Sequence, residues 1–353
     1  MNISVISFTK NGNALAKKLK EKLMRDETAV VDLYQDVTLG SWVGEQFAAG
    51  RPIVFIGACG IAVRAIAPHL KSKLSDPPVL VMDEKGQFVI PLVSGHVGGA
   101  NALAAQIAAC MDAVPVITTA TDLNGCFAVD LFAKENQLRI LKKEGIAAVS
   151  GKLLSGESVT VSVEGMQPDG TRADTPGTEE LKMPKGLILN DYPPSKEVDI
   201  VISGDEAELK KAVCPLRPKK YALGLGCRKG KSAADLEEFC RTVLEREKLS
   251  FEDVFVLASI DEKKEEEGIC RLVETQRIPY CTFSAEELKA VKGDFHGSAF
   301  VEEQMGVDNV CERAAVLACG EDGRLILEKQ AKDGMTLAVA RRQWSARNLN
   351  WEI

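Results

Sequence analysis

The chain has 353 residues, of which 45% are hydrophobic and 27% are charged, a composition typical of globular proteins. At about 150 residues per domain, this length predicts two or three domains. The 44 Lys and Arg residues are outnumbered by 51 Asp and Glu residues, for a formal net charge of −7. Nucleic-acid-binding proteins carry the opposite sign because they neutralise phosphates. Neither a membrane helix of about 18–20 apolar residues nor a secretory signal is evident in the sequence, so we expect a cytoplasmic protein.

The residues that most often bind metals are few or poorly spaced. The ten cysteines never form a C-x-x-C pair, which disfavours zinc ribbons and redox dithiols. The histidines are His69, His96 and His296 alone, so a three-histidine centre would require all of them. We therefore expect no metal site of the protein's own.

The first part of the chain alternates short apolar runs with longer amphipathic ones. Strands are predicted near residues 3–8, 29–34 and 52–58, with helices between them, which indicates a parallel sheet covered on both faces. A strand, a D-E-K-G turn and a second strand follow over 77–93, then a helix to residue 111 and a strand over 114–122.

A different pattern begins near residue 130. A helix is predicted over 130–145 and a strand over 158–165, and the polar stretch 167–186 is typical of an exposed loop. From residue 221 the strand-turn-helix alternation returns and ends in a hairpin over 325–342. We predict a multi-domain α/β protein in which two parallel-sheet units with covering helices, residues 1–128 and 216–353, are joined by a smaller α/β unit, residues 129–215.

The turn GLGCRKGKS fits neither common phosphate-binding motif. Lys229 stands where a third glycine of G-x-G-x-x-G should be, and only three residues separate Gly226 from Gly230, one too few for a phosphate loop. Free backbone N–H groups with Arg228, Lys229 and Lys231 still suit an anion. Solvated cations and a Ser232 helix cap explain the pattern equally well.

The segment SGHVGGAN crowds polar and small residues into one strand-to-helix turn: Ser94, Gly95, His96, Gly98, Gly99 and Asn101. A histidine with a pKa near 6.5 suits proton transfer at neutral pH, and the N–H groups of Gly98 and Gly99 are candidate oxyanion donors. The alternative is a histidine that only hydrogen-bonds the turn. Ser94 lies in no G-x-S-x-G elbow, so the common Ser-His-Asp hydrolase is not supported.

Further candidates lie at or just after the ends of two other strands. Thr119, Thr121 and Asp122 form the polar end of the strand predicted over 114–122, at an edge where α/β sheets bind ligands, although Asp122 is equally typical of a helix cap. Arg64 follows the GACG turn and suits a bound carboxylate. The acidic run Glu265–Glu267 is typical of the charged first turn of a helix.

Six segments carry a resemblance to a known family: GACGIAVRAIAPHLKSKLSDPPVLVMDEKGQFVIPLVSGHVGGANALA, PVITTATD, ALGLGCRKG, LASIDEKKEEEG, VCERAAVLA and DGMTLAVAR. Through them the chain closely resembles the cobalt-precorrin-5A hydrolase (CbiG) family of anaerobic vitamin B12 synthesis. The family's carboxyl unit usually reads Ser-x-Asp-x-Lys-x-Asp-Glu, whereas glutamates follow Ser259, Asp261 and Lys263 here.

The resemblance implies a hydrolase that opens the δ-lactone of a cobalt-bound, ring-contracted tetrapyrrole with loss of acetaldehyde. Cobalt then arrives in the substrate, and no cofactor of the protein's own is expected. His96 or Asp122 is the expected base, and neighbouring pathway enzymes are expected partners. The alternatives are a tetrapyrrole carrier without turnover and a nucleotide-dependent enzyme, which the two failed phosphate motifs weaken.

Overall fold

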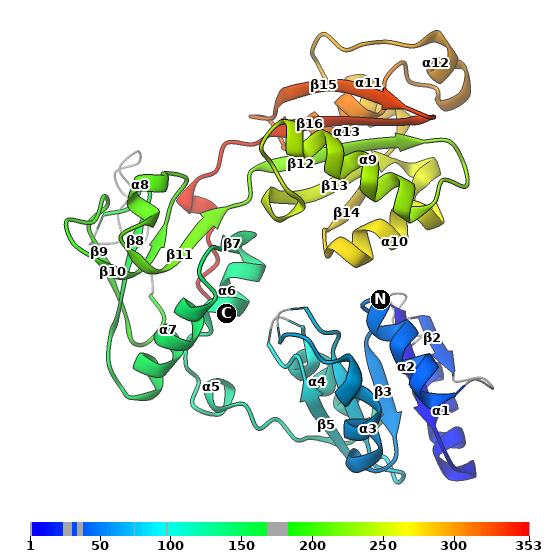
Figure 1. Cartoon of the computed structure of the whole chain (residues 1–353), viewed down its shortest axis with the longest axis vertical. Helices are drawn as coiled ribbons and strands as arrows, with labels where there is room; N and C mark the ends of the chain where they lie inside the picture. Colours follow the sequence, from blue (N-terminus) through cyan, green and yellow to red (C-terminus); the bar gives the residue numbers. More distant parts are fainter. Residues whose placement is uncertain are drawn as a thin grey trace. The chain divides into compact units, whose positions relative to one another are not determined.

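The structure, a computed structural model, describes residues 2–23, 30–33, 38–73, 75–96, 98–167 and 183–352. Contacts divide the chain into two compact units: the first ends at Phe132 and adds Ser150–Glu157, and the second holds Ala133–Val149 and Ser158–Glu352. Each of three sheets takes its strands from one stretch of the chain (Figure 1). The predicted multi-domain α/β class is therefore confirmed, and the domain boundaries stay a prediction. No helix in the described ranges has the length and apolarity to cross a membrane.

The first unit is built on a six-stranded sheet of order β2-β1-β3-β4-β5-β6. Neighbouring strands are parallel except β4 and β5, which form the predicted hairpin around the D-E-K-G turn. The strands are β1 (Asn2–Ser7), β2 (Val30–Leu33), β3 (Ile53–Ile56), β4 (Val79–Met82), β5 (Phe88–Val93) and β6 (Val114–Pro115). The strand predicted over 114–122 is wrong beyond Pro115, where the chain leaves the sheet edge.

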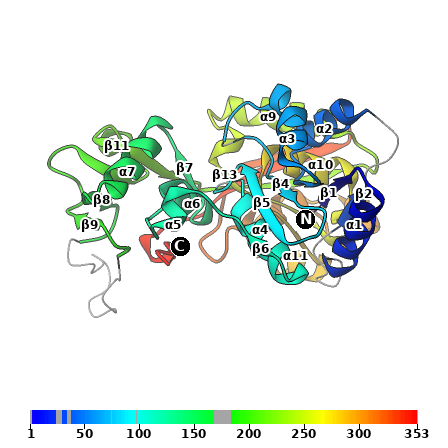
Figure 2. The same cartoon turned by 90° about the horizontal axis from the view of Figure 1, so that it is seen from below.

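Helices cover both faces of this sheet, so every side chain of its inner strand β3 is buried. Val54 and Ile56 join the core beneath α1 (Lys10–Leu23) and α4 (Ala100–Met111). Ile53 and Phe55 join the opposite core beneath α2 (Leu39–Ala48) and α3 (Cys59–Ile66). Figure 2 separates α2 and α3 from α4 across the strands. The predicted three-layer arrangement is confirmed for this unit.

The second sheet has the order β7-β11-β10-β8-β9 and is parallel except for the edge pair β7 and β11. Its strands are β7 (Leu138–Ile140), β8 (Val159–Val163), β9 (Leu187–Asn190), β10 (Val198–Ile202) and β11 (Ala212–Pro218). The helix predicted over 130–145 is wrong: it is divided into α6 (Val129–Glu135), β7 and the start of α7 (Glu144–Leu154). Gln137, at φ 54°, ends the helical course. A short α8 (Glu206–Leu209) follows β10, and most of the predicted loop, 168–182, lies outside the described residues.

The third sheet has the order β14-β13-β12-β16-β15, with β12 to β14 parallel and the predicted carboxyl-terminal hairpin antiparallel. Its strands are β12 (Tyr221–Cys227), β13 (Val254–Ile260), β14 (Tyr280–Phe283), β15 (Arg324–Lys332) and β16 (Met335–Arg341). The helices are α9 (Ala233–Arg246), α10 (Glu267–Gln276), α11 (Ala285–Ala290), α12 (Ala299–Met305) and α13 (Cys311–Ala318).

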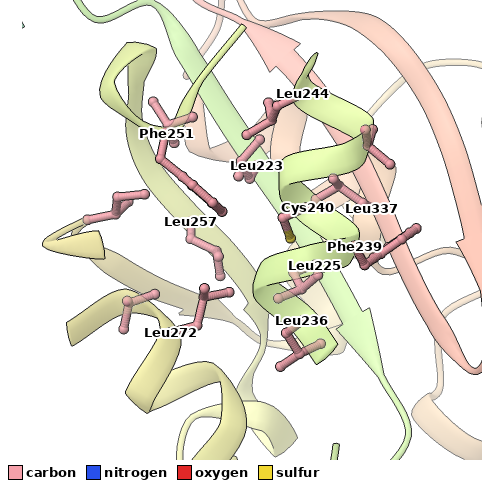
Figure 3. Packing of buried hydrophobic residues seen from close by; sticks show 14 of the residues in the cluster. Leu223, Leu225, Leu236, Phe239, Cys240, Leu244, Phe251, Leu257, Leu272 and Leu337 are labelled. Carbon is pink, nitrogen blue, oxygen red and sulfur yellow. The ribbon is translucent and has the colours of Figure 1, made fainter. Parts of the chain in front are cut away.

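Both faces of the third sheet are covered. Leu223 and Leu225 of β12 pack against Leu236 and Cys240 of α9 (Figure 3). On the other face α13 lies so close to β12 that a Cβ on Gly224 would sit 1.7 Å from the Cys311 carbonyl oxygen. Glycine is therefore required there by the close approach of two backbones.

Candidate active site

The loop from β5 to α4 turns back on itself at Ser94, which has a φ of 61°. The Ser94 hydroxyl donates to the Asp76 carbonyl oxygen at 2.8 Å, and the Ser94 carbonyl accepts the Ala100 N–H at 3.0 Å. A Cβ on Gly98 would lie 2.3 Å from the Ser94 Cβ. The small residues of SGHVGGAN therefore serve a tight reversal that places His96 at the carboxyl end of β5.

The side chain of His96 contacts those of Asp122 and Thr121. Its Nε2 lies 2.8 Å from Asp122 Oδ2 and 2.9 Å from Thr121 Oγ1. Both partners belong to α5 (Ala120–Leu123), which follows the departure of the chain from β6. The side chain of Asp122 is 38% exposed and that of His96 is 16% exposed, so the carboxylate is the more accessible of the two.

Asn101, in the first turn of α4, links the turn after β5 to the segment that holds Thr119 and Asp122. Its Nδ2 donates to Asp122 Oδ2 at 3.0 Å and to Thr119 Oγ1 at 3.1 Å. Its side chain also leaves no room for a Cβ on Gly95, which would lie 2.9 Å from Asn101 Oδ1. The structure thus brings together Ser94, Gly95, His96, Gly98, Asn101, Thr119, Thr121 and Asp122 from the predicted set.

Asp130 is a member of this cluster that the sequence did not reveal. It lies in the first turn of α6 with its side chain only 5% exposed, and its Oδ1 is 3.8 Å from His96 Nδ1. Lys73 Nζ is 3.8 Å from Asp130 Oδ2. The one signal of Asp130 in the sequence is that it opens an amphipathic segment, and that segment is predicted to begin the next domain.

The charged groups of this cluster stabilise one another's ionised forms. The neighbouring Asp130 carboxylate is the largest influence on His96 and raises its pKa above 6.5; burial opposes this, and Asp122 adds to it. Burial alone would raise the pKa of Asp130, but its interactions with His96, Lys73 and the Leu131 N–H outweigh burial and lower it. Both directions favour an ion pair of His96 with Asp130.

The oxyanion donors expected in this loop are partly engaged. Of the two expected N–H groups, that of Gly99 donates to the His96 carbonyl at 2.8 Å. The Gly99 N–H is therefore not available to stabilise an oxyanion, contrary to the prediction. Gly99 has a φ of 86° and precedes α4, so its glycine is explained by the turn.

Arg64 lies apart from these contacts. It is exposed in the last turn of α3 and forms no ion pair with any residue in the described ranges. Its predicted role in binding a carboxylate stays a prediction.

The glycine turn after β12 already holds an anion, and that anion belongs to the chain. Glu266 Oε1 accepts the Gly230 N–H at 2.7 Å, while its Oε2 lies 2.8 Å from Lys263 Nζ. Burial raises the pKa of Glu266, but the hydrogen bonds from Lys263 and Gly230 outweigh it and lower that pKa. The backbone donor of this turn is therefore occupied.

The cations of the turn are nevertheless accessible. Arg228 and Lys229 are exposed and Lys231 is half-buried. Ser232 caps α9 by accepting the Asp235 N–H, as one of the two interpretations predicted. Thr336 Oγ1 would lie 2.6 Å from a Cβ on Gly226, so that glycine has a packing role. Binding of a substrate anion by this turn stays a prediction.

Comparisons with known proteins match both ends of the chain. The family described as Cobalamin synthesis G N-terminal (CbiG_N) matches residues 41–122, and that described as Cobalamin synthesis G C-terminus (CbiG_C) matches residues 221–340. A protein of Salmonella typhimurium named cobalt-precorrin-5A hydrolase is 33% identical over 96% of this chain and 97% of its own length. This chain belongs to the CbiG family.

Two further likenesses extend over most of this CbiG protein. A cobalt-precorrin-5A hydrolase of Priestia megaterium is 30% identical over 96% of this chain and 94% of its own length. The crystal structure of a cobalamin biosynthesis protein G homologue from Sulfolobus solfataricus covers 97% of each chain at 24% identity with a TM-score of 0.41. His96 and Asp122 fall within the CbiG_N match, whereas Asp130 lies outside both matched regions.

Proposed function

We propose that this chain is a cobalt-precorrin-5A hydrolase, which opens the δ-lactone of the cobalt-bound tetrapyrrole and releases acetaldehyde to give cobalt-precorrin-5B. The observation that carries the proposal is the 33% identity, over 96% of the chain, to a protein of that name. The cluster around His96 supports it, since lactone hydrolysis requires a group that accepts a proton from water.

The reaction has two stages with simple proton requirements. Water adds to the lactone carbonyl carbon as a base takes one of its protons, and the carbon–oxygen bond of the lactone then breaks. The freed hydroxyl next loses its proton, the adjacent carbon–carbon bond breaks, and its electron pair enters the macrocycle as acetaldehyde leaves. His96 and Asp122, 2.8 Å apart, are the candidate bases for both stages.

The substrate carries many carboxylates, and cations near them would contribute charge-assisted hydrogen bonds. In our proposal Arg64 serves this purpose in the first unit, and Arg228, Lys229 and Lys231 serve it in the second. Cobalt enters and leaves within the macrocycle, so the chain's own part is to bind, orient and move protons. We further propose that it works in the cytoplasm beside neighbouring enzymes of the pathway.

The test is anaerobic incubation of the purified protein with cobalt-precorrin-5A, with trapping of released acetaldehyde. We expect release above a control without enzyme, and a loss of about 10²–10⁴-fold in turnover for His96→Gln if the histidine takes part in proton transfer. His69→Gln is the matched control, because His69 packs beside Phe47 and is expected to leave turnover unchanged.

Two results would contradict the proposal. A tightly bound, unaltered macrocycle with no acetaldehyde would make the chain a carrier of the intermediate. Equal turnover of His96→Gln and wild type would leave the hydrolase but remove the histidine from its mechanism.

A further inference from the structure

Each ring nitrogen of His96 faces a different carboxylate. Nε2 lies 2.8 Å from Asp122 Oδ2, and Nδ1 lies 3.8 Å from Asp130 Oδ1. An ionised carboxylate only accepts hydrogen bonds, and a neutral imidazole has a single N–H to donate. Nε2 is within hydrogen-bond distance of one carboxylate and Nδ1 is within ion-pair distance of the other. The arrangement therefore suits the imidazolium, which carries a proton on each nitrogen and has no lone pair left to accept another.

The charged and titratable groups around His96 come from three elements. Asp122 and the Thr121 hydroxyl face it from α5, and Asp130 faces it from α6. Lys73, from the segment before β4, lies 3.8 Å from the other oxygen of Asp130. The Leu131 N–H donates to Asp130 Oδ1 at 3.0 Å. Asp130 is thus a buried anion fixed against the ring.

Asp122 is more exposed than Asp130, and one of its carboxylate oxygens accepts no hydrogen bond from the described residues. Its Oδ2 takes hydrogen bonds from Asn101 Nδ2 and His96 Nε2. Its Oδ1 takes none from any residue in the described parts of the chain, and its side chain is 38% exposed against 5% for Asp130. A partly exposed carboxylate that is oriented through one oxygen and has the other without a hydrogen bond suits the role of a base toward a water molecule.

We propose that Asp122 is the base of the hydrolase, acting through Oδ1, and that Asp130 is a positioning residue that holds His96 as a cation behind it. The inference rests on the proposed function and assigns its proton transfers. Oδ1 takes one proton from water as the water oxygen bonds to the lactone carbonyl carbon. When the carbon–oxygen bond breaks, the leaving oxygen takes that proton from Asp122, and the carboxylate is restored.

The first test measures the charge of His96 without turnover. The chain has only three histidines, His69, His96 and His296, so ring ¹⁵N signals of labelled protein can be assigned with single His→Gln variants. We expect both His96 nitrogens to be protonated at neutral pH, and the titration midpoint to fall in Asp130→Asn. A neutral ring at pH 7, or a midpoint that Asp130→Asn leaves in place, would overturn the role of Asp130.

The second test uses the pH dependence of kcat/KM for acetaldehyde release. If His96 must stay protonated, activity falls on the alkaline side, and Asp130→Asn moves that limb to lower pH while Asp130→Glu restores it. If neutral His96 were the base, Asp130→Asn would move the acid limb instead, and this outcome would overturn the proposal. The control is Asp112→Asn, because Asp112 is exposed at the end of α4 in a left-handed conformation that asparagine tolerates.

Asp122→Asn keeps the shape of the side chain and removes the base. We expect kcat to fall about 10²–10⁴-fold while His96 remains charged in the ¹⁵N spectra. Retention of wild-type kcat would overturn the role of Asp122. If wild type itself releases no acetaldehyde, the proposed function fails, and the ¹⁵N titration still decides whether Asp130 holds His96 as a cation.

Discussion

Replacing Glu266 with alanine would empty the anion site of the glycine turn after β12. Glu266 joins the Gly230 N–H to Lys263 Nζ at 2.7 and 2.8 Å. The side chains of Lys263 and Glu266 are only 7% and 9% exposed. The substitution therefore leaves a covered ammonium and a backbone donor without their acceptor.

The loss in the free energy of unfolding follows from the broken ion pair. Removing one partner of a buried ion pair costs about 3–5 kcal/mol. We take about 3 kcal/mol, since the pair lies in a surface turn covered by neighbouring side chains. For a unit of this size, that lowers the midpoint of thermal unfolding by roughly 6–12 °C. Glu265→Ala is the matched control, because Glu265 is exposed and its loss should change stability by about 0.5 kcal/mol or less.

The assay is thermal unfolding of wild type, Glu266→Ala and Glu265→Ala in acetate and in chloride at equal ionic strength. The change from glutamate to alanine removes a group the size of acetate, so acetate should raise the midpoint of Glu266→Ala alone by binding its folded state. Equal midpoints for Glu266→Ala and wild type, or equal acetate effects on all three proteins, would refute the reasoning. Because the pKa of Glu266 is lowered in the folded state, the gap should be full above its unfolded pKa and close as pH falls through the folded one.

Three further predictions concern stability. Gly224→Ala drives a Cβ into the Cys311 carbonyl at 1.7 Å and should cost about 3 kcal/mol by denaturant unfolding. The coupling free energy between His96 and Asp130, measured by a double-mutant cycle, should be fully present between the unfolded-state pKa of the aspartate and that of the histidine. It should be lost as pH rises through the raised pKa of His96, and also as pH falls through the lowered pKa of Asp130. Glu312→Gln should cost about 1.5–3 kcal/mol in thermal or denaturant unfolding, because this buried carboxylate accepts two backbone N–H groups.

Elements with strong local signals could be predicted from the sequence. The D-E-K-G and D-G turns each join two apolar runs, and both hairpins formed as expected. The strand predicted beyond Pro115 does not form, for a physical reason. Its β-branched residues have strand propensity, but β6 lies at the sheet edge and pairs with only Phe88 and Val89, and propensity does not report whether a partner is available.

The helix predicted over 130–145 is wrong because a short strand within it has apolar residues at a spacing that is also typical of an amphipathic helix. Leu138–Ile140 pairs antiparallel with β11, a partner more than 70 residues later in the chain. Local periodicity carries no information on such a distant contact. The same limit hid Asp130, whose importance depends on its position beside His96 and not on its neighbours in the sequence.

The two glycine turns looked alike as sequence and differ as sites. After β12 the turn closes on Glu266, 36 residues beyond Gly230, and its backbone donor is occupied by the chain's own carboxylate. After β5 the turn instead presents His96 to two carboxylates, and Oδ1 of the partly exposed Asp122 accepts no hydrogen bond from the described residues. Hydrolysis requires a base that water can reach, which the turn after β5 could supply. The turn after β12, with its anion site filled and its cations exposed or half-buried, is better suited to binding a ligand rich in carboxylates. If the proposed function holds, we expect the chemistry to belong to the first unit, and substitutions in the turn of the second unit to affect KM more than kcat.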